Sequence, residues 1–143
     1  MSHSLMTASI MDAIRAAIVS AWGAMPISFG TPLLPIPSVP HAVLHWDTVE
    51  ISFSGPGATV GGVSQRNRFT ILGRFPFPSD PSQVISLQKV VQANLLISAL
   101  QGGPNFDSVG LLPLVTQVSA ETPDDLNEKV FSVMLRFEVV TLA

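Results

Sequence analysis

The sequence predicts an α+β fold in two layers, with two helices on one face of a four-stranded mixed or antiparallel sheet. Three observations predict it. Apolar residues recur every three or four positions in two segments, they alternate with polar residues in four others, and these segments follow in the order helix, hairpin, helix, hairpin (αββαββ). At 143 residues the chain is expected to form one domain, 1–143.

The first helix is expected at 7–22, where Ile10, Ile14 and Ile18 fall on one side. Residues 25–40 contain five prolines, which exclude a helix and a central strand. An extended Pro-rich arm is therefore predicted there. It lies either on its own domain or across a neighbouring subunit.

The first hairpin is expected to pair strands 41–53 and 66–77 across a glycine-rich tip. The second strand has one apolar and one polar face. The apolar face carries Phe69, Ile71, Phe75 and Phe77, and the polar face carries Arg66, Arg68, Thr70 and Arg74. The tip is a candidate gripping loop through Gly55, Gly57, Gly61 and Gly62.

The second helix has a clear start and stop. Asp80 is placed to cap it, Pro81 suits the first helical position, and 102–104 (GGP) ends it. The periodicity places Leu87 and Val91 in the core.

The second hairpin is expected to join strands 111–119 and 128–142 through a turn that contains Pro123, Asp124 and Asp125. The sheet face away from the helices is expected to be only partly polar, because it receives Leu72, Leu112, Leu114, Val118, Met134 and Val140. Something is therefore expected to cover that face.

The composition favours self-association. Hydrophobic residues make up 47% of the chain and charged residues only 12%, about half the usual share. A monomer of this size needs a more polar exterior, so part of its apolar surface is expected to meet another copy. The net charge of −3 provides no general basic field for nucleic acid.

The same composition excludes several kinds of site. The chain has no cysteine, so disulfides, thiolate catalysis and Cys-ligated metals are excluded. Asp12, Arg15 and Lys89 interrupt the hydrophobic segments, so no membrane span is expected, and the N-terminal segment lacks the basic leader of a secretory signal.

No motif assembles into a catalytic, cofactor-binding or metal site, and the chain is not expected to be an enzyme. GPGATVGG lacks the third glycine of a dinucleotide loop and the Lys-Ser or Lys-Thr pair of a nucleotide-triphosphate loop. His41 and His45 share a strand face but stand about 13 Å apart, too far to bind one metal ion. His45 and Asp47 can pair, yet no serine nucleophile motif accompanies them.

The arginines have two interpretations. Their stripe is either a solvated face paired with acids such as Glu50 or Glu138, or a surface that contacts a neighbour's carboxylates or DNA phosphates. The candidate subunit-interface or channel residues are Arg66, Arg68, Arg74, Arg136 and Glu138.

The whole-chain pattern resembles the tail terminator family of long-tailed bacteriophages, with its related tail-completion and neck proteins. Four features carry the resemblance: the amphipathic first helix, the strand RNRFTILGRFPFP, the capped helix SDPSQVISLQKVVQANLLISAL and the final strand KVFSVMLRFEVVTL. Together they span nearly all of the chain.

The resemblance implies a structural virion protein without enzymatic activity. Such proteins form a ring, usually a homohexamer, that caps the tail tube and joins it to the neck connector of the head. The implied partners are other copies of the chain, the tail tube protein and the connector protein, with at most passing contact with DNA. The implied location is the tail–neck junction of the virion, after assembly in the host cytoplasm.

Two alternatives stay open at this point. A head-completion or neck adaptor protein shares the pattern, and the Pro-rich arm at 25–40 does not match the family clearly. Helices and hairpins in this order also build small-molecule-binding α+β modules.

Overall fold

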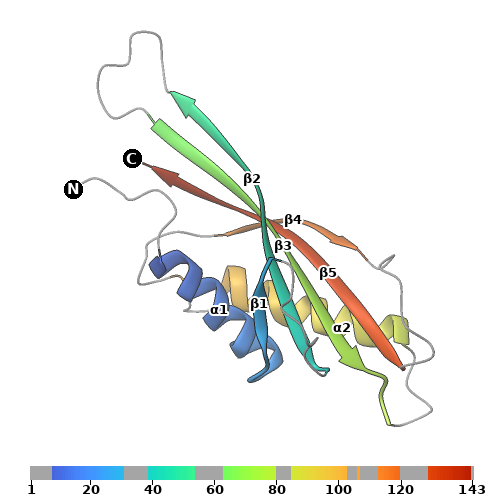
Figure 1. The fold of residues 1–143 in the computed structure, drawn as a ribbon. Helices are drawn as coiled ribbons and strands as arrows, with labels where there is room; N and C mark the ends of the chain where they lie inside the picture. Colours follow the sequence, from blue (N-terminus) through green and yellow to red (C-terminus); the bar gives the residue numbers. More distant parts are fainter. Residues whose placement is uncertain are drawn as a thin grey trace.

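The computed structural model describes residues 8–30, 39–53, 63–79, 85–102, 106, 113–119 and 129–142. It has an α+β fold with two helices and a five-stranded mixed sheet (Figure 1). The elements in chain order are α1 (Ala8–Trp22), β1 (Ile27–Phe29), β2 (His41–Phe53), β3 (Val63–Pro76), α2 (Ile85–Ile97), a π-helical turn (Ser98–Gly102), β4 (Leu114–Ser119) and β5 (Val130–Leu142).

The sheet has the order β1-β2-β3-β5-β4, with three long antiparallel strands at its centre. The strand order corrects the predicted four-stranded αββαββ arrangement, because β1 adds a fifth strand. β1 lies inside the predicted Pro-rich arm and pairs in parallel with β2. It fits between prolines because it has three residues and lies at the edge, where few backbone donors are needed.

Two backbone hydrogen bonds hold the ends of β1. The Ala42 N–H donates to the Pro26 carbonyl at 3.0 Å, and the Gly30 N–H donates to the Leu44 carbonyl at 2.8 Å. Gly30 has φ 76°, a left-handed conformation that glycine adopts without strain, so the chain turns away directly after the strand.

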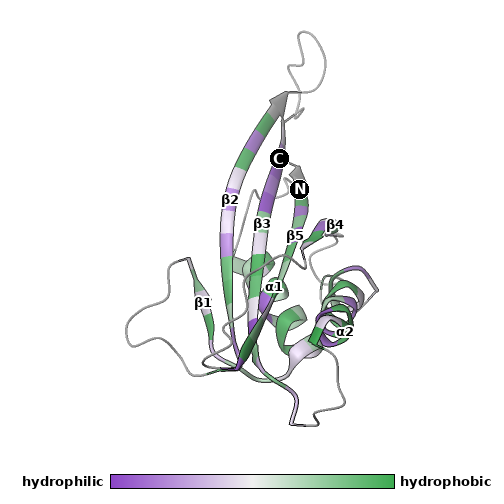
Figure 2. Cartoon of the chain, turned by 90° about the vertical axis from the view of Figure 1, so that its right-hand side faces the viewer, coloured by the Kyte–Doolittle hydropathy of each residue, from purple (hydrophilic) through white to green (hydrophobic). Residues whose placement is uncertain are grey.

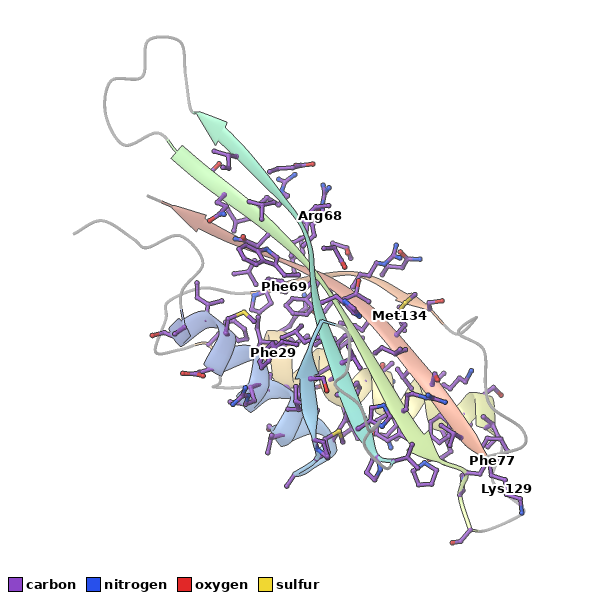
Figure 3. All side chains as sticks on the ribbon, in the orientation of Figure 1. Phe29, Arg68, Phe69, Phe77, Lys129 and Met134 are labelled. Atoms are coloured by element: carbon purple, nitrogen blue, oxygen red, sulfur yellow. The ribbon has the colours of Figure 1, made fainter. Side chains whose placement is uncertain are left out.

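Both helices pack on one face of the sheet, as predicted (Figures 1 and 2). Figure 3 shows Phe69 on the helix side and its neighbour Arg68 on the other side, so the predicted faces of β3 are confirmed. The Phe69 and Phe137 rings stack with centroids 5.1 Å apart. Large side chains under 2% exposed fill this core, among them Phe69, Phe131, Phe137, Ile14, Ile18, Leu44, Ile71, Leu96, Leu100 and Leu135.

Gly73 of β3 allows the last residue of α1 to approach the sheet closely. A Cβ atom at Gly73 would lie 2.7 Å from two ring atoms of Trp22. The Trp22 ring also meets Phe75 edge-on at 5.0 Å, and its indole N–H donates to the Gln92 carbonyl at 3.0 Å. Trp22 therefore joins α1, the sheet and α2.

The orientation of α2 differs from the prediction. Leu87 and Val91 were expected in the core, but they are 58% and 41% exposed. The buried side chains of α2 are Lys89, Ala93 and Leu96. Ala93 is small, so this side of the helix lies close to the sheet, whereas the larger apolar side faces outward.

Several predicted features lie outside the described residues. These are most of the Pro-rich arm (31–38), the glycine-rich tip (54–62), the cap of the second helix (80–83) and the turn between the last two strands (120–128).

Candidate functional site

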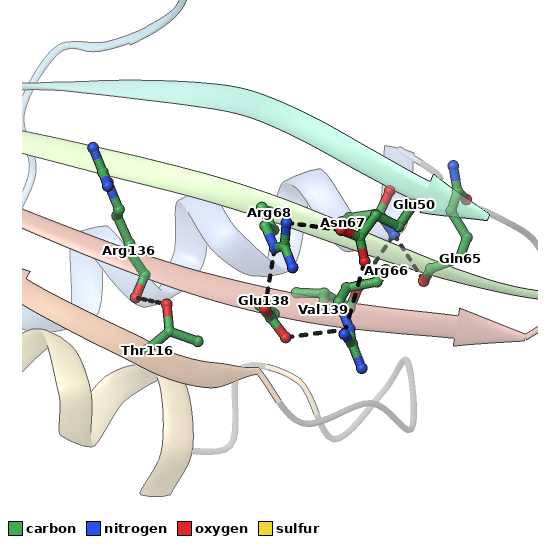
Figure 4. Close-up of polar contacts among 9 residues, drawn as sticks. All are labelled: Glu50, Gln65, Arg66, Asn67, Arg68, Thr116, Arg136, Glu138 and Val139. Atoms are coloured by element: carbon green, nitrogen blue, oxygen red, sulfur yellow. Dashed lines mark hydrogen bonds and ion pairs between the residues drawn. The ribbon is translucent and has the colours of Figure 1, made fainter. Parts of the chain in front are cut away.

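Four charged side chains form a network on the sheet face opposite the helices (Figure 4). Arg66 lies 3.8 Å from Glu50 and 3.5 Å from Glu138, and Arg68 lies 3.0 Å from Glu50 and 3.2 Å from Glu138. The antiparallel register places Glu50 opposite Arg66 and Arg68 opposite Glu138, so β2, β3 and β5 each contribute to the network.

This arrangement fits a role in fixing the register of the strands better than a role as a binding site. Side chains that are 41–50% exposed at Arg66, Arg68 and Glu50 form pairs worth about 0–1 kcal/mol each. A one-residue slip would separate all of them, because side chains alternate between faces. The hydrogen bond that Arg68 Nε donates to Glu138 and the negative charge of Glu50 raise the pKa of Arg68, which keeps its positive charge.

The other two candidate arginines have no carboxylate partner in the described part of the chain. Arg136 donates from Nη1 to Gln117 Oε1 at 3.3 Å, and Arg74 lies opposite His41 and Ser132 in the register. The five candidate residues therefore divide into an internally paired group and two cations with no described ion pair. Arg74 and Arg136 are the better placed to meet a neighbour's acids.

A pocket of about 340 Å³ opens beside this network. It lies where the β2 ladder is irregular after Trp46. There Asp47 accepts a hydrogen bond from the Thr70 hydroxyl rather than from His45. The pocket is lined by Asp47, Thr48, Arg68, Phe69, Thr116, Arg136 and Phe137.

The outward side of α2 is an apolar surface that the sequence reasoning assigned to the core. Four large side chains on it are 41–58% exposed, and they are called here the α2 stripe: Leu87, Val90, Val91 and Leu95. The one charged residue of α2, Lys89, lies on the opposite, buried side. No sequence signal indicated this orientation, because a lysine ordinarily lies on the solvent side of a helix, whereas Lys89 lies on the buried side.

A second apolar surface lies on β2, on the helix side of the sheet but beyond the helices (Figure 1). It consists of Trp46, Val49 and Ile51, 38–59% exposed, and is called here the β2 stripe. The bulge between Trp46 and Thr48 shifts the alternation by one residue, so even-numbered Trp46 shares a face with the two odd-numbered residues. Simple alternation missed Trp46 for this reason.

The described residues contain no group of three His, Asp or Glu side chains that could hold a metal ion. No helix that the structure describes has the length and apolar character needed to cross a membrane. The candidate gripping loop, with its four glycines, falls in the range 54–62 and is not described.

Comparisons with known proteins add no assignment. No protein-family model matches the chain, and no curated protein matches it significantly.

Proposed function

We propose that the chain is a structural protein that forms a ring of identical copies, six by resemblance, at the tail–neck junction of a long-tailed bacteriophage. The ring caps the tail tube and presents its other side to the neck connector. The observation that carries the proposal is the pair of apolar stripes, on α2 and β2, exposed on a chain with only 12% charged residues.

Ring closure suits this surface. A heterologous interface joins one patch of a copy to a different patch of the next copy. If the rotation between neighbouring copies closes a circle, both patches of every copy are covered and no free end remains. Six copies in a circle would then hide both apolar stripes of every copy from water. Arg66 and Arg68 are paired with Glu50 and Glu138, so on the described part of the open sheet face the arginines without an ion pair are Arg74 and Arg136. Two such cations agree with at most passing contact with DNA.

The test is reconstitution with the tail tube protein of the same phage. Native mass spectrometry should give a closed ring, and electron microscopy should show tubes with the ring at one end and no further growth from that end. A ring that ignores tube ends but binds the head connector would instead support the neck adaptor. A chain that stays monomeric both alone and with tubes would refute the ring.

The pocket beside Arg136 favours a second candidate, a small-molecule-binding α+β module. Its volume of about 340 Å³ is at the lower end for ligand sites. Ligand-dependent thermal stabilisation of a monomer, lost in Arg136→Ala, would support this function over the ring.

A further inference from the structure

The outward face of α2 lacks the charges that solvate an ordinary surface helix. The other exposed positions in α2 are Ser86 and Asn94, and Ser98 follows directly after the helix. The exposed side of α1, in contrast, carries Asp12 and Arg15. Since a surface helix normally has a charged or polar outer face, α2 requires a partner in a way that α1 does not.

The two stripes cannot cover each other within one copy. Figure 2 shows β2 and α2 on opposite sides of the molecule, with β3 and β5 between them. Figure 1 shows the outer half of β2 projecting past both helices. Among the described residues neither stripe is covered by the other, and a second copy of the chain offers a partner surface for each.

The stripes match in length and chemistry. The α2 stripe runs about 12 Å from Leu87 to Leu95 at the rise of a helix. The β2 stripe runs about 16 Å from Trp46 to Ile51 at the rise of a strand. Neither includes a charged side chain, so packing one on the other buries no unpaired charge.

We propose that the α2 stripe of one copy packs on the β2 stripe of the next copy. The inference rests on the ring proposed above and names its interface. A head-to-tail contact covers both stripes of every copy, whereas a two-fold contact between two α2 helices would leave Trp46 and its neighbours exposed.

The exposed area of the stripes suits the centre of such an interface rather than the whole of it. At 50% exposure, Trp46 alone leaves on the order of 100 Å² open. A specific interface buries about 800 Å² per partner around an apolar centre with a polar rim. The stripes supply that centre, and the serine and asparagine side chains beside the α2 stripe supply part of the rim.

Complementation between two variants tests the pairing. One variant, Leu87→Asp with Val91→Asp, damages only the α2 stripe, and the other, Ile51→Asp, damages only the β2 stripe. Val19→Asp is the matched control, because Val19 is 41% exposed on α1 and belongs to neither stripe. Circular dichroism first checks that each variant is folded, and Leu87→Ser with Val91→Ser replaces the first variant if it is not.

Native mass spectrometry and sedimentation at micromolar concentration measure the outcome. Each stripe variant alone should be monomeric, or should need at least about tenfold more protein to assemble than the wild type. An equal mixture should form a dimer and stop there, since one intact α2 stripe meets one intact β2 stripe. Val19→Asp should assemble like the wild type.

Other outcomes overturn the inference and separate it from the ring function. If Ile51→Asp alone forms dimers, and the mixture contains those dimers but no dimer of the two different variants, the contact is between two α2 helices. If wild type and both stripe variants all form rings that cap tubes, the function stands and this interface is wrong. If the wild type stays monomeric even with tubes, both proposals fail.

Discussion

Replacing Leu96 with alanine, and separately Leu87, tests the observed orientation of α2. Leu96 is fully buried against the core, so its truncation should lower the free energy of unfolding by about 2–5 kcal/mol. Leu87 is 58% exposed, so the same change there should cost less than about 1 kcal/mol. Alanine's higher helix propensity reduces the second cost further.

Urea denaturation followed by far-ultraviolet circular dichroism measures both values. The slope of free energy against urea should be the same in both variants and the wild type, so that a shifted midpoint reports stability alone. The protein must be dilute enough to remain monomeric, because assembly would add its own stabilisation. A cost at Leu87 equal to that at Leu96 would place Leu87 in the core and remove the α2 stripe.

Three further substitutions test other parts of the structure. Gly73→Ala should destabilise the fold by about 1–3 kcal/mol in thermal unfolding and change the near-ultraviolet signal of the tryptophan that ends α1, whereas Gly102→Ala, with open space around it, should not. Asn67→Asp replaces a buried amide, which donates to two backbone carbonyl groups, with a carboxylate that cannot donate when ionised. Urea unfolding at neutral pH should show that the free energy of unfolding falls by more than about 2 kcal/mol. A variant as stable as the wild type would contradict the burial of Asn67. Arg68→Glu should lower the free energy of unfolding by about 1 kcal/mol, because it brings like charges together. Adding Glu138→Arg should restore most of that stability. If it restores none, the network does not couple these strands.

Alternation along the strands predicted the centre of the sheet well. β2 begins and ends where the sequence indicated, and the apolar and polar faces of β3 are as expected. These strands are long, and one face of each central strand packs under helices, so burial enforces the period of two. β1 was not predicted, because a strand of three residues is too short to show a periodic pattern. The prolines around it instead indicate an extended arm.

Helical periodicity predicted that α2 exists but assigned the wrong side of it to the core. Both sides carry apolar residues, and the larger ones at Leu87, Val91 and Leu95 point outward. Sequence reasoning assigns the more hydrophobic side to the core, which holds for a helix that meets only its own sheet. The rule fails where a second apolar surface is exposed, so this error itself points to a partner for α2.

The placement of charge strengthens the case for a partner. The chain has only seven Lys and Arg and ten Asp and Glu residues, and Glu50, Arg66, Arg68 and Glu138 pair with one another on the open sheet face. Four of these seventeen charged side chains therefore already have partners within the chain. Since this network lies on the other face of the sheet from the β2 stripe, it provides no charged rim that would keep a second copy away from Trp46. The sheet thus has one face on which charge pairs hold the strands in register, and one whose outer end exposes the β2 stripe, the surface proposed above to contact a second copy.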